Sequence, residues 1–378
     1  MLPDGSVVLD VQGAQNRQHR DRGIARYTVE QVAGVLDHAP GAVRAVTINP
    51  DLTLPGRLDF LFGRDLLQPI GPNRPLTGEP PQLFHITSPI ELDLSIDQLW
   101  PRWTRTPATQ LVVTLYDLIP LVFEDHYLRD PLARARYLAR LNLVRAADRV
   151  LAISRTTADD AIERLDLDAD RVTVIDAGVS ERFVRGYDAP EAARAVLQRR
   201  LPELREGFLL YVGGIEYRKN IERLVDGYAR MPAGARRRHQ LVIACRMTPE
   251  DRDRLQRHGR DLGLGGGELV LPGYVTDDEL TALYHRCTLF VFPSLYEGSG
   301  LPILEAMACG APVAASNTST SPEILGDTEA TFDPHDGGDI ARVMTQVVDD
   351  AELLERLRER SRSRAARYTW SHVAMRTI

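Results

Sequence analysis

The sequence predicts an α/β fold made of two doubly wound parallel-sheet domains, on three observations. The chain has 378 residues, more than one hydrophobic core usually serves. Short, almost continuously apolar runs alternate with helical runs, which is typical of parallel sheets covered on both faces. This alternation stops at residues 178–194 and then restarts, so we interpret that stretch as a linker. We expect one Rossmann-like domain over 1–183, a second over 184–355, and a C-terminal helix over 356–378.

Six strands are expected in the first half, each a short run rich in β-branched or aromatic residues. They are VVLDVQ (7–12), VRAVTI (43–48), LFHIT (83–87), QLVVTLYD (110–117), RVLAIS (149–154) and RVTVID (171–176). Helical spacing of apolar residues predicts helices over 23–38, 130–147 and 155–165. Ser154 is expected to cap the last of these helices.

The second half repeats the pattern. Its expected strands are FLLYVG (208–213), QLVIAC (240–245), ELVL (268–271), LFVF (289–292) and PVAAS (312–316). Thr276 and Glu279 form a capping box that predicts the start of a helix. The stretch 353–375 predicts one long Arg-rich helix, with Tyr368 and Trp370 as anchors on the first domain. Two such sheets place a ligand in a cleft between them, at the carboxyl ends of the strands.

Composition excludes several classes of protein. The net charge of −7 disfavours general nucleic-acid binding, and 43% hydrophobic with 26% charged residues is ordinary for a globular chain. The three cysteines have no CxxC spacing, which indicates reduced thiols. No run reaches eighteen apolar residues, and the N-terminus lacks the pattern of a signal peptide. We therefore expect a cytoplasmic protein.

The stretch YEGSGLPILEAMACGAPVAAS, residues 296–316, holds two acidic residues on either side of a glycine-rich turn. Placing Glu305 near the start of a helix would suit the helix dipole by a few tenths of a kcal/mol. That explanation does not cover Glu297, which is expected in the loop, nor Gly298 and Gly300, which allow close backbone approach. Carboxylates would repel a phosphate but accept hydrogen bonds from neutral sugar hydroxyls.

A helix is expected over 302–309, with Pro302 at its first position and Gly310 at its end. Amides at a helix N-terminus have no intrahelical acceptor and form an anion site with the dipole. The amides expected there belong to Ser299, Gly300, Leu301 and Ile303. Free amides between two acids would suit a nucleoside diphosphate sugar.

A basic pair precedes another helix in LLYVGGIEYRKNIERLVDGY, residues 209–228. Arg218 and Lys219 lie just before Asn220, the expected N-cap, where a helix dipole disfavours cations. Cations placed against this electrostatic preference suggest a functional role. A diphosphate would need an Arg fork and a Lys point charge at this position. Gly213 and Gly214 would let it approach the backbone closely.

The stretch PSLYEGSGLPILEAMACGAPV (293–313) resembles the E-x7-E segment of retaining glycosyltransferases of the GT-B fold (family 4, group 1). The resemblance implies that Glu297 lies by the donor hexose and Glu305 by the ribose, and that Arg218 and Lys219 neutralise the departing diphosphate. Ser299 stands where the family more often has an aromatic residue.

LPGYVTDDEL (271–280) resembles the family's base-binding turn, which implies that the base packs near Tyr274 and bonds the backbone of Val275. RDRGIARYTVE (20–30) is similar to the first loop, whose Gly23 would face the donor phosphates.

The run VVTLYDLIPL (112–121) matches a segment where relatives commonly carry His-Asp, with the His beside the reacting sugar. Here Tyr116 replaces that His, so an imidazole base is not expected at this position. Asp117 is then expected to face the acceptor. His85, at another strand end, is more simply explained as structural.

The sequence thus predicts a retaining, metal-independent hexosyltransferase that uses no cofactor, with a nucleoside diphosphate sugar as donor. LYDLIPL (115–121) together with RGIARY (22–27) resembles bacterial mannosyltransferases. This resemblance favours GDP-mannose, with UDP-sugars and other GDP-sugars close behind. The acceptor would be a hydroxyl of a glycan, a glycolipid or a small molecule. The Arg-bearing helix at 129–149 leaves weak contact with the inner face of a membrane open, although a solvated helix face is the simpler interpretation.

Three alternatives stay open: a sugar-nucleotide epimerase, a phosphorylase, and a non-catalytic sugar-nucleotide-binding subunit, the last supported by Tyr116. A phosphorylase should show a pyridoxal lysine environment, which we do not identify. An oxidoreductase is disfavoured because no GxGxxG follows a strand with an acidic residue about twenty positions on.

Overall fold

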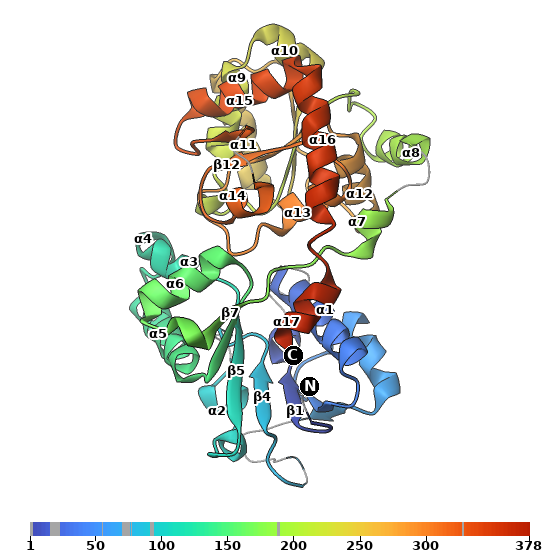
Figure 1. Ribbon diagram of the computed structural model, residues 1–378. Helices are drawn as coiled ribbons and strands as arrows, with labels where there is room; N and C mark the ends of the chain where they lie inside the picture. The colour runs from blue at the N-terminus through green and yellow to red at the C-terminus, as the bar shows by residue number, and fades with distance from the viewer. Residues whose placement is uncertain are drawn as a thin grey trace. The chain divides into compact units, whose positions relative to one another are not determined.

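The computed structural model describes residues 3–15, 23–54, 56–69, 76, 78–90, 94–186, 190–326 and 329–378. The chain divides into two compact units (Figure 1). Unit 1 comprises Met1–Gly178 and Thr369–Ile378, and unit 2 comprises Val179–Tyr368.

Unit 1 is built on a seven-stranded parallel sheet in the order β3-β2-β1-β4-β5-β6-β7. The strands are β1 (Val7–Asp10), β2 (Val43–Ile48), β3 (Leu67–Pro69), β4 (Leu83–Ile86), β5 (Gln110–Leu115), β6 (Arg149–Ala152) and β7 (Val172–Val174). The order reverses between β1 and β4, so the sheet is doubly wound, as predicted. β3 was not predicted, because a three-residue strand is too short to show a pattern.

Helices cover both faces of this sheet, and each face has its own core. The α-helices are α1 (Gly23–His38), α2 (Ile96–Leu99), α3 (Ile119–Val122), α4 (Glu124–Tyr127), α5 (Pro131–Ala146), α6 (Arg155–Leu165) and α17 (Trp370–Thr377). The 3-10 helices are η1 (Gln12–Gln15), η2 (Gly56–Arg64), η3 (Arg102–Thr104) and η4 (Ala169–Arg171). Phe84 and Leu141 belong to one core, and Leu9 and Val32 belong to the other. Ser154 caps α6 as predicted, since its hydroxyl accepts the Thr157 amide at 3.0 Å.

Unit 2 is built on a six-stranded parallel sheet in the order β10-β9-β8-β11-β12-β13. The strands are β8 (Leu209–Val212), β9 (Leu241–Ala244), β10 (Leu269–Val270), β11 (Leu289–Phe292), β12 (Val313–Ser316) and β13 (Thr331–Phe332). The order reverses between β8 and β11, which makes this sheet doubly wound as well.

The helices of unit 2 are α7 (Glu181–Arg185), α8 (Pro190–Arg200), η5 (Tyr217–Lys219), α9 (Ile221–Arg230), α10 (Ala233–Arg238), α11 (Pro249–Asp261), α12 (Asp277–Arg286), α13 (Leu301–Ala308), α14 (Thr320–Leu325), α15 (Gly337–Asp349) and α16 (Ala351–Ala365). Among them, α11, α12, α15 and α16 begin at a side-chain cap. The predicted capping box is present: the Glu279 amide donates to the Thr276 hydroxyl at 3.3 Å, and the Thr276 amide donates to the Glu279 carboxylate at 2.8 Å. The expected linker at 178–194 instead holds α7 and the start of α8.

The prediction of one long C-terminal helix was wrong. Thr369 adopts an extended conformation and caps a new helix, because its hydroxyl accepts the His372 amide at 3.1 Å. α16 therefore ends within unit 2, and α17 packs beside α1 in unit 1 (Figure 1). Trp370 meets Tyr27 edge-on in unit 1, with ring centroids 5.0 Å apart, whereas the carbonyl of Tyr368 accepts the Val179 amide in unit 2.

Two further features concern the described residues as a whole. None of their helices combines the length and the apolar character needed to cross a membrane. Their three cysteines, Cys245, Cys287 and Cys309, are all buried and unpaired.

Gly178→Ala should destabilise unit 1. A Cβ at residue 178 would lie 2.5 Å from Cδ2 of Trp370, and forcing a close-packed ring aside costs about 1–3 kcal/mol. Thermal unfolding should show a midpoint several degrees lower than that of the parent protein. Gly266→Ala is the matched control, because its Cβ would meet nothing within 4 Å. Equal midpoints for the parent and Gly178→Ala would show that Trp370 is not packed on residue 178.

Candidate functional site

The candidate site lies at the carboxyl edge of the unit 2 sheet, where the strand order reverses between β8 and β11. Loops on either side of such a reversal diverge and leave room for a ligand. Two loops meet this description: residues 213–220, the β8 loop, and residues 293–300, the β11 loop. They carry most of the residues that the sequence singled out.

Hydrogen bonds hold the two loops together. The Leu295 amide donates to the carbonyl of Arg218 at 2.7 Å. The side-chain amide of Asn220 donates to the carbonyls of Pro293 and Pro334, at 3.0 and 2.7 Å. Asn220 does occupy the N-cap position of α9, but its φ is 58° and its side chain makes no capping bond. Its position was predicted correctly, and its capping role was wrong, because the side chain joins loops instead.

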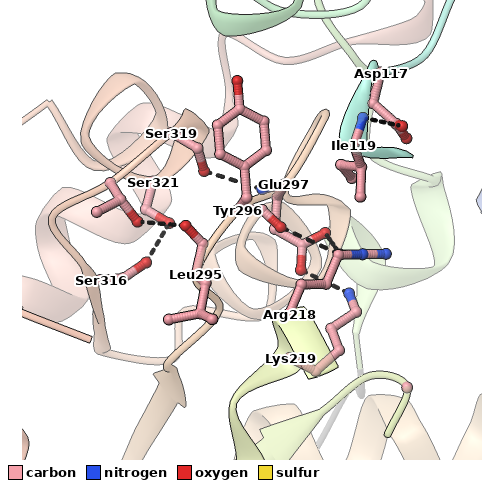
Figure 2. A network of polar contacts seen from close by, with 12 residues as sticks. Asp117, Ile119, Arg218, Lys219, Leu295, Tyr296, Glu297, Ser316, Ser319 and Ser321 are labelled. Atoms are coloured by element: carbon pink, nitrogen blue, oxygen red, sulfur yellow. Dashed lines mark hydrogen bonds and ion pairs between the residues drawn. The ribbon is translucent and has the colours of Figure 1, made fainter. Parts of the chain in front are cut away.

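Arg218, Lys219 and Glu297 form one ion cluster (Figure 2). The Arg218 guanidinium donates to Glu297 Oε2 at 2.6 Å, and the Lys219 ammonium donates to Oε1 at 2.7 Å. Arg218 also donates to the carbonyl of Tyr296 at 3.3 Å. Sequence reasoning assigned the two cations and the carboxylate to different parts of one ligand. The structure instead brings all three into direct contact.

The cluster is largely buried. The side chains of Lys219 and Glu297 are 9% exposed and that of Arg218 is 18% exposed. Burial alone would raise the pKa of Glu297, but the charges of Lys219 and then Arg218 hold that pKa at about 2. Burial lowers the pKa of Lys219, and Glu297 opposes this effect. The charge of Glu216 also raises the pKa of Lys219, so a second acid lies near the cations. Two adjacent cations at this edge could still exchange a carboxylate for another anion.

Helix α13 begins directly after the β11 loop. Gly300 precedes it with a φ of 62°, and a Cβ there would lie 2.6 Å from Cδ1 of Ile324, so two constraints require glycine. Pro302 is the second residue of the helix and not the first as predicted, because α13 begins at Leu301. Gly310 follows the last turn as predicted. Leu301 is the first residue of α13, where an amide has no intrahelical acceptor. An anion contact by the amides of Ser299, Gly300 and Leu301 stays a prediction. The prediction for Ile303 was wrong, because its amide donates to the carbonyl of Gly300 at 2.9 Å.

The glycines of the β8 loop make room for neighbouring side chains of the protein itself. A Cβ at Gly213 would lie 2.5 Å from the hydroxyl oxygen of Tyr211, and one at Gly214 would lie 2.2 Å from a carboxylate oxygen of Glu216. The Tyr211 hydroxyl donates to the carbonyl of Gly214 at 2.8 Å. Close approach of a ligand to these glycines stays a prediction. Gly298, in the β11 loop, is buried.

Glu305 lies in the second turn of α13, so the dipole does not account for its position. The residue is only 8% exposed, and its Oε2 accepts the hydroxyl of Tyr284 at 3.1 Å. Sequence reasoning missed Tyr284, because a tyrosine on the apolar face of a helix is indistinguishable from core.

Tyr274 is 61% exposed, and Val275 beside it is half-buried. The guanidinium carbon of Arg246 lies 5.2 Å from the centroid of the Tyr274 ring, a cation–π distance. Arg246 was also missed. The signal that could have found it is a cation two residues after a buried strand, at the carboxyl edge where ligands bind.

The other predicted residues belong to unit 1. Tyr116 is buried there, its hydroxyl oxygen 2.9 Å from that of Thr28 on α1. The Asp117 carboxylate accepts the Ile119 amide at 3.0 Å, which starts α3. Gly23 is the exposed first residue of α1, and residues 16–22 before it lie outside the described residues. Roles for Tyr116, Asp117 and Gly23 in the reaction stay predictions.

His85 is a core residue of unit 1. Burial lowers its pKa to about 4, and its Nε2 lies 2.8 Å from the Thr114 hydroxyl oxygen. The imidazole is therefore neutral at physiological pH, which agrees with the structural interpretation. Across the described ranges, we find no group of three or more His, Cys, Asp or Glu side chains placed to hold a metal ion.

Two family models match the chain, one on each half. The model described as "Glycosyl transferase 4-like domain" matches residues 10–178, and "Glycosyl transferases group 1" matches residues 196–364. The second match contains the ion cluster and both loops of the candidate site.

Two relatives from Escherichia coli are similar in sequence. The chain is 40% identical to "Serotype-specific mannosyltransferase WbdA" over 264 residues, which cover 70% of this chain and 32% of the relative. It is 31% identical to "O-antigen chain mannosyltransferase B" over 269 residues, which cover 71% of this chain and 68% of the relative. The chain thus spans about a third of the length of WbdA.

Solved structures share the fold. The structure of HepE from Anabaena, in complex with UDP and glucose, superposes with a TM-score of 0.72 over 98% of both chains, at 16% identity. At this identity the likeness concerns the fold alone.

Glu297→Gln should remove an acid-sensitive part of the stability. The folded-state pKa of about 2 lies below the ordinary value of 4.5, so the carboxylate stabilises the protein above pH 4.5 and loses this effect as the pH falls towards 2. The shift corresponds to about 3 kcal/mol. Thermal midpoints of parent and variant should differ widely at pH 6 and converge as the pH falls.

Glu359→Gln, at an exposed glutamate of α16, is the control and should follow the parent at every pH. A difference between the parent and Glu297→Gln that stays constant with pH would contradict the ion cluster.

Proposed function

The chain belongs to the group 1 glycosyltransferases, and from this premise we propose that it transfers mannose from GDP-mannose to a hydroxyl of a glycan. We further propose that the sugar keeps its anomeric configuration and that the reaction needs neither a metal ion nor a cofactor. Membership of the family supports the general activity, transfer of a sugar from a sugar nucleotide.

One observation carries the proposal: two adjacent cations, Arg218 and Lys219, share one carboxylate at the strand-order reversal of unit 2. A diphosphate carries enough negative charge to replace that carboxylate as the partner of both cations. Arg218 offers a planar fork for two phosphate oxygens, and Lys219 offers a point charge. The amides at the start of α13 would stabilise the same group.

The contacts of Glu297 suggest an exchange of partners during donor binding. In this structure one oxygen of the Glu297 carboxylate accepts a hydrogen bond from Arg218, and the other accepts one from Lys219. An incoming diphosphate would take over Arg218 and Lys219, and the carboxylate would then accept hydrogen bonds from hydroxyls of the attached hexose. Positive charge held in place before the reaction stabilises the departing diphosphate without reorganisation.

The proposed transfer is balanced without a protein nucleophile. The bond from the sugar C1 to the phosphate oxygen breaks, and the acceptor oxygen bonds C1 on the same face. The acceptor proton passes to the departing phosphate oxygen. Because Arg218 and Lys219 stabilise that oxygen as its charge develops, a metal ion is not required in this scheme.

The donor is chosen on two grounds. Both E. coli relatives carry the name mannosyltransferase, which supports mannose. Arg246 lies against Tyr274 at the proposed base position, and a guanidinium can donate to the O6 and N7 acceptors of guanine. Glu305, whose carboxylate accepts the Tyr284 hydroxyl, would hold the ribose. The name of the second relative supports an O-antigen type of acceptor.

Replacing both Arg218 and Lys219 with alanine should weaken GDP binding by at least about 100-fold, because charge-assisted hydrogen bonds contribute about 1.5–3 kcal/mol each. Isothermal titration calorimetry measures this directly. The matched control replaces Arg237 and Arg238, an adjacent pair on α10, and should bind GDP like the parent. If the Arg218/Lys219 variant binds GDP as tightly as the parent, the diphosphate does not bind at these two residues.

Incubation of the protein with GDP-mannose and a synthetic mannoside acceptor tests the activity. We expect an α-linked product by proton NMR, undiminished by EDTA, with UDP-glucose and GDP-glucose as competing donors that react more slowly. Glu297→Gln should lower the rate by at least about 100-fold, as expected for loss of a charged contact to the reacting sugar. A β-linked product, or activity that EDTA abolishes and Mg²⁺ restores, would refute retention or metal independence respectively.

A further inference from the structure

A strained serine follows β12. Ser319 has φ 49° and ψ −130°, a conformation that glycine adopts readily and residues with a Cβ rarely adopt. Such strain persists only where surrounding contacts hold it, and it gathers at functional sites. A glycine would relieve it, so the serine hydroxyl supplies something that glycine lacks.

The hydroxyl oxygen of Ser319 accepts the backbone amide of Glu297 at 3.0 Å (Figure 2). The neighbouring Thr318 hydroxyl donates to the carbonyl of Leu295 at 3.0 Å. Two consecutive side chains thus bond the β11 loop on both sides of Tyr296. The loop that carries the carboxylate is held by its own strand and also by the segment after β12.

The same segment is anchored at its other end. The hydroxyl oxygens of Ser321 and Ser316 lie 3.4 Å apart, which joins the first turn of α14 to the end of β12 (Figure 2). Ile324 packs so closely on Gly300 that a Cβ there would lie 2.6 Å from its Cδ1. Ser319 therefore bonds Glu297 from a support that is itself fixed.

The hydrogen bond between the Ser319 hydroxyl and the Glu297 amide holds a different part of Glu297 from the ion pairs. The ion pairs hold the carboxylate through the two cations that a diphosphate would recruit. The Ser319 bond holds the backbone of Glu297 and involves neither cation. It therefore persists when the cations change partners.

We propose that Ser319 is a positioning residue for sugar transfer, which keeps the Glu297 carboxylate aimed at the donor sugar once the diphosphate has taken Arg218 and Lys219. The proposal rests on the proposed function. It explains why a strained serine stands where glycine would be easier: the backbone conformation brings the hydroxyl to the Glu297 amide, and only a side chain with an oxygen can accept it.

Three substitutions separate positioning from structural support. Ser319→Gly relieves the strain and removes the acceptor, Ser319→Ala keeps the Cβ and removes the acceptor, and Ser319→Thr keeps the Cβ and the acceptor. If the bond positions Glu297, kcat should fall at least about ten-fold in the Gly and Ala variants and stay within about three-fold of the parent in Ser319→Thr. The thermal midpoints should not rank the variants as kcat does, because Ser319→Gly should unfold at or above the midpoint of the parent.

GDP affinity by calorimetry should stay within about two-fold of the parent in all three variants, because Arg218 and Lys219 are unchanged. Asp166→Gly is the matched control, since Asp166 caps the end of α6 with a φ of 57°. It should relieve strain without changing kcat.

A Ser319→Gly variant that transfers mannose at the parental rate, or variants whose activity simply follows their stability, would overturn the proposal. If the parent itself binds GDP but transfers no sugar, the proposed function fails instead, so the two failures are distinguishable.

Discussion

The ion cluster of Arg218, Lys219 and Glu297 is the interaction on which the candidate site depends. Three charges removed from water persist only if they satisfy one another, and here one carboxylate serves two cations. The arrangement holds both cations in a largely buried position. In the function proposed above, Glu297 is their partner until the donor binds, so the cations are already in place for the diphosphate.

The fold brings these residues together. The β8 and β11 loops are far apart in sequence but follow neighbouring strands of one parallel sheet, at the point where the strand order reverses. The helices that follow add their N-terminal amides to the same edge. A third segment, after β12, bonds the β11 loop from the adjacent strand. The proposed donor contacts thus come from two strand-to-helix connections, a third connection supports one of them, and the sheet fixes the spacing between all three.

Much of this could be predicted from the sequence, for identifiable reasons. Strand and helix periodicity located α1, α6, β2 and β11 to the residue, because their apolar patterns are regular. Arg218 and Lys219 stood out because cations are disfavoured before a helix, and Glu297 stood out because the helix dipole does not explain an acid in the loop. Their mutual contact could not be predicted, since it joins residues about eighty positions apart. Ser319 left no signal, because its strain exists only in the backbone, and the break before α17 was hidden by a continuous helical pattern.

A crystal structure of the GDP complex would show whether a diphosphate replaces Glu297 as the partner of Arg218 and Lys219. We expect phosphate oxygens within hydrogen-bonding distance of the Arg218 guanidinium and the Lys219 ammonium. We also expect the contact of 2.7 Å between Lys219 Nζ and Glu297 Oε1 to lengthen or break. An unchanged ion cluster, with the diphosphate bound away from both cations, would show that the diphosphate does not displace Glu297.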